Sequence, residues 1–418
     1  MFDRVTVRMY EMGFGDCFLV TFWKEKIGKS VLFDCGSLSR TKAEISKVAA
    51  DVVASCMGDD GKPRIELVVC THRHKDHVNG FDDAVWAKVE VGEVWMPWTE
   101  NPRDAEATRI RERQSSFAFA LCKSLDANFK PSDMPLADGR NDEVAARLAL
   151  ALNALSLTNE KAMATLHDGF AGRPPRYFLP LKDSVAEVRT VAGLPGVTFH
   201  ILGPSRSESV IKSMNPPAGG AYLANLGGAG SNPPRPKPAC ETKWQISQPE
   251  FETLTRGMST FTAKDREEVN KAADEPDGDL AAAIDQAVNN TSLVTMIEVG
   301  GQFLLFPGDA QWGTWKAILD DADGRRLLEH TTMLKVSHHG SHNGTPKELV
   351  EKLLQKGTVA LVSTEPVKQW PDVPRAPLMK ALAAQAILAR SDKATKVKGQ
   401  AGFTVEESYV VWETLVPS

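Results

Sequence analysis

The segment 71–77 constrains what this chain can fold into more than any other part of the sequence. It reads Thr-His-Arg-His-Lys-Asp-His and follows an apolar run, Ile65–Cys70, that is typical of a buried strand. Its three imidazoles and one carboxylate would crowd one another at neutral pH unless a cation organised them. Neutral imidazole and carboxylate groups are the ligands that zinc and similar divalent ions take. The pattern therefore predicts a metal site at the end of a buried strand.

The spacing of the four side chains favours two metal ions. Residues two apart in an extended segment point the same way, so His72 and His74 can bind one ion. After a bend in the chain, Asp76 and His77 can face a second ion close by. A water molecule held between two such ions becomes the nucleophile of a two-metal hydrolase. The alternative interpretation is a surface loop that happens to be rich in histidine.

A second group of the same residue types lies near the end of the chain. The apolar run Gln302–Phe306 leads into Pro-Gly and then Asp309. A buried carboxylate without a partner costs several kcal/mol, and bridging two cations would remove that cost. The alternative is that Asp309 only caps a helix over 310–320. Farther on, the strand predicted over 331–337 ends in a His-His-Gly-Ser-His run. Six of the nine histidines fall within 72–77 and 338–342, so we expect these two segments to form the two sides of one site.

The motif HxHxDH at residues 72–77 resembles the signature of the metallo-β-lactamase fold superfamily. Other segments narrow the resemblance to the metallo-β-lactamase domain of the ComEC competence family: MGFGDCFLV followed by VLFDCG, NNTSLV leading to FLLFPGDA, and LKVSHHGS. The resemblance covers residues 4–98, 197–204 and 289–415. Phe14 stands where that family usually has Gln, and Trp370-Pro371 stands where it usually has His-Pro.

The resemblance implies an α/β fold, a four-layer αββα sandwich that carries a large helical and loop insertion. It implies two divalent metal ions, with zinc favoured and manganese as the alternative. The ligands that it implies are His72, His74, Asp76, His77, Asp309 and His339. It assigns the role of proton transfer to Asp76 or His338. The roles of His338 and His339, as proton-transfer group and metal ligand, can be exchanged. Three further residues are possible members of the site: His342, Asp16, which is favoured as a structural residue of its turn, and Asn290, near the place where many relatives supply a third histidine.

The predicted layout has three parts. Residues 1–98 form the first half of the core, with strands over 4–10, 17–23, 30–33 and 65–70 and a helix over 41–57. Residues 99–288 are inserted helices and a Pro/Gly-rich loop, with one core strand near 197–204. The helices are expected over 103–129 and 142–165, and the Pro/Gly-rich tract 205–243 fits either a lid or a solvated excursion. Residues 289–418 form the second half of the core.

Composition limits the possible partners. The chain has 418 residues and a net charge of −5, so any binding of a polyanion must come from a local patch or from the metals. No long apolar run, no secretory signal and no Cys-x-x-Cys pair is present, so we expect no membrane contact and buried thiols in the cytoplasm. The resemblance to the ComEC-type domain implies metal-dependent hydrolysis of a phosphodiester by a nuclease or phosphodiesterase, with nucleic acid or a nucleotide as substrate. The alternatives are a hydrolase of small esters, thioesters or lactones, and a non-catalytic interaction module with structural metals.

Overall fold

A computed structural model describes residues 1–58, 60–112, 114, 159–213, 215–217, 219–222, 288–367, 370 and 372–417. The chain divides into two compact units, the first made of 1–98, 159–224 and 289–418 and the second of 99–158 and 225–288. In the second unit the description covers only 99–112, 114 and 288, and it includes a helix over 105–112. Most of the helices predicted over 103–129 and 142–165, and most of the tract 205–243, therefore lie outside the described residues.

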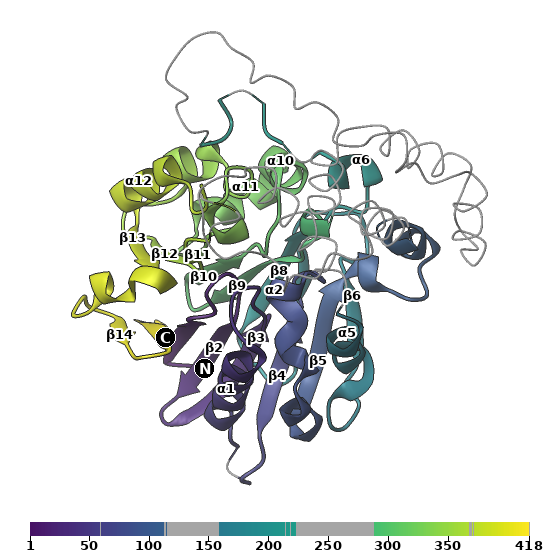
Figure 1. The fold of residues 1–418 in the computed structure, drawn as a ribbon. Helices are drawn as coiled ribbons and strands as arrows, with labels where there is room; N and C mark the ends of the chain where they lie inside the picture. The colour runs from purple at the N-terminus through teal and green to yellow at the C-terminus, as the bar shows by residue number, and fades with distance from the viewer. Residues whose placement is uncertain are drawn as a thin grey trace, which may run out of the picture. The chain divides into compact units, whose positions relative to one another are not determined.

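The first unit is a mixed α/β fold with two mixed sheets (Figure 1). In the first sheet, β3 to β6 run parallel and the other neighbours run antiparallel. The strand order is β14 (Phe403–Val405), β15 (Tyr409–Leu415), β1 (Arg4–Tyr10), β2 (Phe18–Lys24), β3 (Ile27–Phe33), β4 (Arg64–Val69), β5 (Glu90–Pro97) and β6 (Arg176–Leu179).

In the second sheet, β10 to β13 run parallel and the remaining strands run antiparallel. The tight turn between β9 and β10 is made by Gly300 and Gly301, which both have positive φ. The strand order is β13 (Ile387–Arg390), β12 (Val359–Val362), β11 (Met333–Lys335), β10 (Gln302–Phe306), β9 (Val294–Val299), β8 (Thr198–Gly203) and β7 (Glu187–Arg189).

The sheets do not follow the predicted halves of the chain strictly. The hairpin β14–β15 comes from the predicted second half but pairs with β1 in the first sheet. Three strands of the predicted insertion, β6, β7 and β8, extend the two sheets. We did not predict β6 and β7, because strands of four and three residues carry too little alternation to be recognised.

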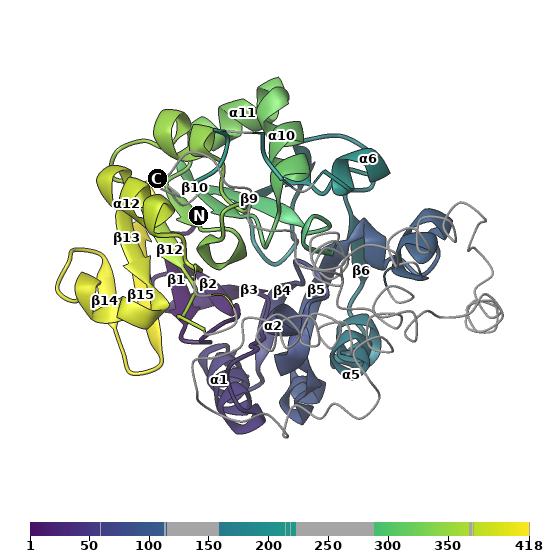
Figure 2. The ribbon, with the colours of Figure 1, turned by 45° about the horizontal axis from the view of Figure 1, so that its top comes forward.

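Three hydrophobic clusters hold the two sheets and their helices together. The first takes side chains from both sheets, and Phe33 stacks on Phe306 there with ring centroids 4.1 Å apart. The second joins the other face of the first sheet to α1 (Lys42–Ser55) and α5 (Glu160–Ala164). The third joins the second sheet to α10 (Trp312–Asp320), α11 (Ala322–Glu329) and α12 (Ala376–Gln385). Figure 2 shows α1 and α5 on one side of the strands and α10 and α11 on the other.

The helices of the described part are short. None of them has both the length and the apolar character that are needed to cross a bilayer. The four cysteines in this part of the chain, at positions 17, 35, 56 and 70, are buried thiols with no disulfide among them.

Candidate metal centre

The predicted ligands follow the carboxyl ends of parallel strands. The segment 71–77 follows β4, Asp309 follows β10, and His339 follows β11. Ligands bind at this edge in open α/β sheets, because the loops of neighbouring parallel strands converge there. A backbone hydrogen bond of 2.8 Å from Leu293 N to Thr71 O joins the loops of the two sheets. Two segments far apart in sequence therefore meet at one edge.

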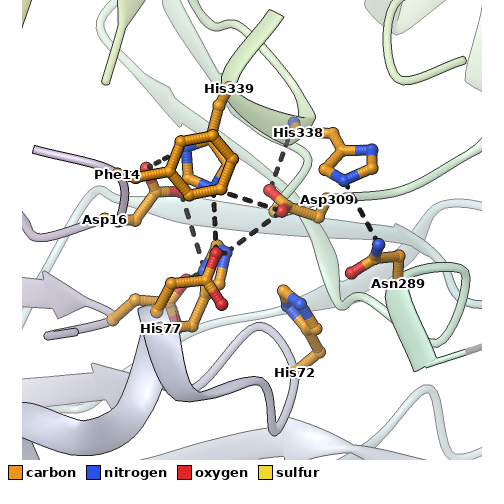
Figure 3. Close-up of polar contacts among 12 residues, drawn as sticks. Phe14, Asp16, His72, His77, Asn289, Asp309, His338 and His339 are labelled. Atoms are coloured by element: carbon orange, nitrogen blue, oxygen red, sulfur yellow. Dashed lines mark hydrogen bonds and ion pairs between the residues drawn. The ribbon is translucent and has the colours of Figure 1, made fainter. Parts of the chain in front are cut away.

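Four buried side chains converge at this edge: Asp76, His77, Asp309 and His339. Figure 3 labels three of them, His77, Asp309 and His339. One ligand atom from each lies within 4.8 Å of the others. His339 Nε2 is 3.1 Å from Asp76 Oδ2 and 3.5 Å from Asp309 Oδ2. His77 Nε2 is 3.1 Å from Asp309 Oδ2. The structure thus brings Asp76 and His77, from the first part of the chain, next to Asp309 and His339, from its last part. Together the four side chains form a group that could hold a metal ion.

Hydrogen bonds at Nδ1 orient the two histidines of this group. His77 Nδ1 donates to Asp34 Oδ2 at 2.8 Å, and Asp34 also accepts from the backbone N and the Oγ1 of Thr71, at 2.7 and 2.6 Å. His339 Nδ1 donates to the backbone O of Ser363 at 2.9 Å. A histidine whose Nδ1 proton is engaged in this way directs Nε2 toward the ligand. Both Nε2 atoms therefore face the carboxylates of the cluster.

The carboxylates control the protonation of these histidines. Burial alone would lower the pKa of His77 and of His339, but Asp309 and the neighbouring carboxylates raise both pKa values above the usual range. Burial would likewise raise the pKa of Asp309, but His77 and Lys335 hold that pKa well below its usual range. Protonated imidazoles thus supply the positive charge that a bound cation would otherwise supply.

The buried charges do not balance. Four buried carboxylates, those of Asp16, Asp34, Asp76 and Asp309, face one buried ammonium and the protonated imidazoles of His77 and His339, which leaves an excess of negative charge. The ammonium is that of Lys335, which donates to Gly308 O at 2.9 Å and to Asp309 Oδ1 at 3.1 Å and also pairs with Asp16. An excess of buried negative charge is costly unless cations compensate for it. The chemistry of the donor set therefore fits one or more bound divalent cations.

Asp34 and Lys335 belong to the candidate site, although we predicted no role for either of them. The signal for Asp34 was the same one that singled out Asp309, a carboxylate that directly follows an apolar strand. The signal for Lys335 was a charge within a buried three-residue strand, between Leu334 and Val336. A buried lysine is rare unless it is paired, so this position also pointed to nearby carboxylates.

Asp16 lies on the Nδ1 side of the two histidines. Its carboxylate is 3.6 Å from His77 Nδ1 and 3.7 Å from His339 Nδ1. Its backbone N–H donates to Asp76 O at 3.0 Å, which fixes the turn against the ligand loop. These contacts fit a residue that positions the ligands from behind.

His72 and His74 lie beside the four-residue group but are not members of it. The His72 ring is 4.1 Å from the His77 ring and 4.9 Å from the His74 ring. Burial lowers the pKa of His72 well below its usual range and lowers the pKa of His74 to about 4, so both are neutral. His72 Nε2 is buried and has no hydrogen-bond partner among the described residues. An orphaned buried nitrogen of this kind is what a ligand of an added cation would present.

His338 and His339 differ in direction, although both have a φ of 50°. The ring of His339 enters the cluster, whereas the ring of His338 joins a polar network. His338 Nδ1 lies 2.8 Å from Ser341 Oγ and 3.2 Å from Asn343 Oδ1, and its Nε2 lies 3.3 Å from Asn289 Nδ2. Only the backbone N–H of His338 reaches the cluster, where it donates to Asp309 Oδ1 at 3.1 Å.

Two further candidates lie outside the ligand group. The amide nitrogen of Asn290 donates to the backbone oxygens of residues 210, 211 and 213, at 3.1, 2.8 and 3.1 Å. Its Oδ1 accepts from the backbone of Gln311 and Thr314, which leaves no amide atom for a metal. Asn290 is therefore a brace between loops, and the structure places it outside the four-residue group. His342 is half-buried, and its pKa is lowered by burial and by Arg375.

Two glycines allow the backbone of the ligand loop to be packed closely. A Cβ at Gly36 would lie 2.6 Å from Asp76 C and His77 N, and a Cβ at Gly15 would lie 2.2 Å from Gly36 O. Such distances do not occur between real atoms, so the glycines in the segments MGFGDC and DCG are required by this close approach. Helix α2 (Lys75–Val78) is held in place by it.

No protein-family model matches this chain, and a search of curated proteins gave no match. What the chain does is therefore inferred from the geometry and chemistry of its site.

Proposed function

We propose that this chain is a metal-dependent hydrolase that cleaves phosphodiesters, as a nuclease or phosphodiesterase. The single observation that carries the proposal is the convergence of Asp76, His77, Asp309 and His339 within 4.8 Å at one edge of the sheets. We further propose that the fold is the four-layer αββα sandwich of the metallo-β-lactamase type. The hydrophobic clusters support it, because one lies between the sheets and two lie under helices on their other faces.

Two divalent ions fit the donor set, with zinc favoured over manganese because imidazoles are prominent among the ligands. One would be held by Asp76, His77 and His339, and the other by His72 and His74, with Asp309 shared between them. The uncompensated carboxylates and the orphaned His72 Nε2 support this assignment. Such ions, when bound, lower the pKa of a water molecule and stabilise negative charge on the attacked phosphate.

His338 is the better candidate for proton transfer. Ser341 Oγ donates its proton to Asn343 Oδ1 at 2.8 Å, so His338 Nδ1 must carry a proton of its own toward this pair. Its Nε2 is then the acceptor, and burial lowers the pKa of His338, which keeps the ring neutral. Asp76, the other candidate, is engaged by His339 at 3.1 Å. His338 can therefore accept a proton at Nε2, which now accepts from Asn289 Nδ2 at 3.3 Å, and the protonated ring can then donate to the phosphate.

Metal content and hydrolysis together test the proposal. We expect protein incubated with Zn²⁺ or Mn²⁺ to retain metal in elemental analysis and to hydrolyse bis(p-nitrophenyl) phosphate. His339→Ala and Asp309→Asn should lower both the metal content and the turnover. His330→Ala is the matched control, because His330 is exposed and its ring stacks on Phe303, at 5.3 Å.

A substrate panel separates the alternatives. Turnover of a thioester or lactone without any turnover of the phosphodiester would replace the proposal with a hydrolase of small esters. Full metal content with no turnover of any ester would favour the non-catalytic module. Metal content unchanged in His339→Ala would remove the basis of the proposal altogether.

A further inference from the structure

A column of aromatic rings stands beside the metal centre. The Phe14 ring lies next to the His339 ring, as Figure 3 shows. The centroids of the two rings are 4.4 Å apart. Trp370 stacks on Phe14 with a centroid distance of 4.9 Å and an interplanar angle of 22°. Phe14 is buried, whereas Trp370 is half-buried, so part of the large indole surface remains available at the edge of the site.

Arg375 lies on the same loop as Trp370, and its positive charge has no strong partner among the described residues. The backbone N–H of Arg375 donates to Gly340 O at 2.9 Å, which fastens the loop to the turn that carries His339. The guanidinium pairs with Asp372 at 3.0 Å, but Asp372 is 70% exposed, and an exposed ion pair of this kind contributes little. Arg375 Nε is buried and finds no hydrogen-bond partner in the part of the chain that the structure describes.

The position of Arg375 in the chain is unfavourable for a positive charge, so the charge is not there to stabilise the fold. It is the residue before α12, where the positive end of the helix dipole disfavours a cation. Guanidinium groups bind phosphate oxygens in a bidentate way, and aromatic rings bind unpaired bases by stacking. With Trp370 five residues away, both kinds of contact are offered by one loop next to one ligand histidine.

We infer that the loop after β12 is a substrate-binding rim, in which a base of a single-stranded nucleic acid stacks on Trp370 and a neighbouring phosphate pairs with Arg375. This inference rests on the proposed phosphodiesterase function and names its substrate class. A base inside a duplex has no free face for the indole, so the rim favours single strands. Because the chain has a net charge of −5, these local contacts must supply much of the strand affinity.

The test compares two ligands of equal length, oligothymidylate and a strand with abasic residues in place of thymidine. Stacking contributes about 1–3 kcal/mol per base, so Trp370→Ala should raise KM for oligothymidylate by about 5- to 150-fold. KM for the abasic strand should not change. Arg375→Gln should raise KM for both strands, because both carry the phosphate. Trp370→Phe should restore most of the preference for the thymidine strand.

Matched controls come from the same unit. Trp23 is half-buried at the end of β2 that is remote from Asp16, and Arg326 on α11 is an exposed arginine paired with Asp323. Trp23→Ala and Arg326→Gln should leave both KM values unchanged. Melting temperatures would show whether each variant is folded.

Fluorescence anisotropy of labelled oligothymidylate measures binding without turnover, so the two proposals can fail separately. Hydrolysis of bis(p-nitrophenyl) phosphate with no effect of Trp370→Ala on either strand would overturn the inference and keep the function. Equal losses on the thymidine and abasic strands would also overturn it. Strand binding that is lost in Trp370→Ala, in a protein that hydrolyses nothing, would overturn the function and keep the rim.

Discussion

Replacing Lys335 by methionine tests whether the buried carboxylates determine the behaviour of the site. The ammonium is buried and lies 3.1 Å from Asp309 Oδ1. With an effective dielectric constant of about 20, the Coulomb attraction at this separation is about 5 kcal/mol. Desolvation of the lysine offsets part of it, and removing one partner of a buried ion pair costs about 3–5 kcal/mol. We therefore expect Lys335→Met to lower the free energy of unfolding of the metal-free protein by about 3–5 kcal/mol.

The loss should be smaller when metal is bound. Divalent cations next to Asp309 would supply the positive charge that the lysine supplied, so we expect the loss in zinc-loaded protein to be at least about 2 kcal/mol smaller. By thermodynamic linkage, zinc must then bind the variant about 30-fold more tightly than it binds the original protein. The direction is diagnostic, because a lysine with a purely structural role would weaken folding equally in both states.

Urea denaturation followed by tryptophan fluorescence, in EDTA and in saturating Zn²⁺, measures both losses. Lys316→Met is the matched control, because Lys316 is more than half exposed on α10 and pairs with Asp320. Its effect should be within about 0.5 kcal/mol in either condition. Equal losses in EDTA and in zinc for Lys335→Met, or a loss below about 1 kcal/mol in EDTA, would refute the charge argument.

Three further predictions concern the same loops. Gly36→Ala places a Cβ 2.6 Å from the backbone of the ligand loop, so elemental analysis should find the bound metal lost. Gly58→Ala is the control and should retain the metal, because its Cβ would lie 3.1 Å from the Asp60 carboxylate and 3.3 Å from Lys62 O, outside the ligand loop. The pKa values of His77 and His339 are raised in the metal-free protein, so zinc binding near neutral pH must displace protons and its affinity must fall as the pH falls; calorimetry in two buffers of different ionisation enthalpy would count these protons. Asn290→Ala removes an amide group whose two N–H donors are shared among three backbone carbonyls, so urea denaturation should show a loss of about 1–3 kcal/mol with an unchanged metal content.

The long, strongly patterned elements of the fold could be predicted from the sequence. The strand 4–10 and the helix 41–57 carry clear apolar periodicity, and Thr41 with Glu44 forms the capping box that begins α1 at Lys42. The membership of strands in sheets could not be predicted, because register and neighbour choice depend on contacts between distant segments. The pairing of β15 with β1 is such a contact.

The site was predicted where residue chemistry alone is informative. Imidazoles and carboxylates at strand ends identified Asp76, His77, Asp309 and His339, which the structure brings together. The residues behind them were harder to find. Thr71 acts through hydrogen bonds to Asp34 at 2.7 and 2.6 Å, and no local pattern distinguishes such a threonine from any other.

The backbone strain of the first unit also points to the site. Six non-glycine residues in the described part of this unit have a positive φ, and three of them lie at the site: Asp34 with a φ of 53° and His338 and His339 with a φ of 50° each. This conformation costs about 1–2 kcal/mol per residue. Glycine at position 34 would relieve that strain, but it would remove the carboxylate that orients His77 and accepts two hydrogen bonds from Thr71. The hydrogen bonds that the Asp34 carboxylate accepts offset the cost of the strained backbone, because a hydrogen bond to a charged acceptor contributes about 1.5–3 kcal/mol. Asp34→Gly should therefore change the direction of His77 more than it changes the fold.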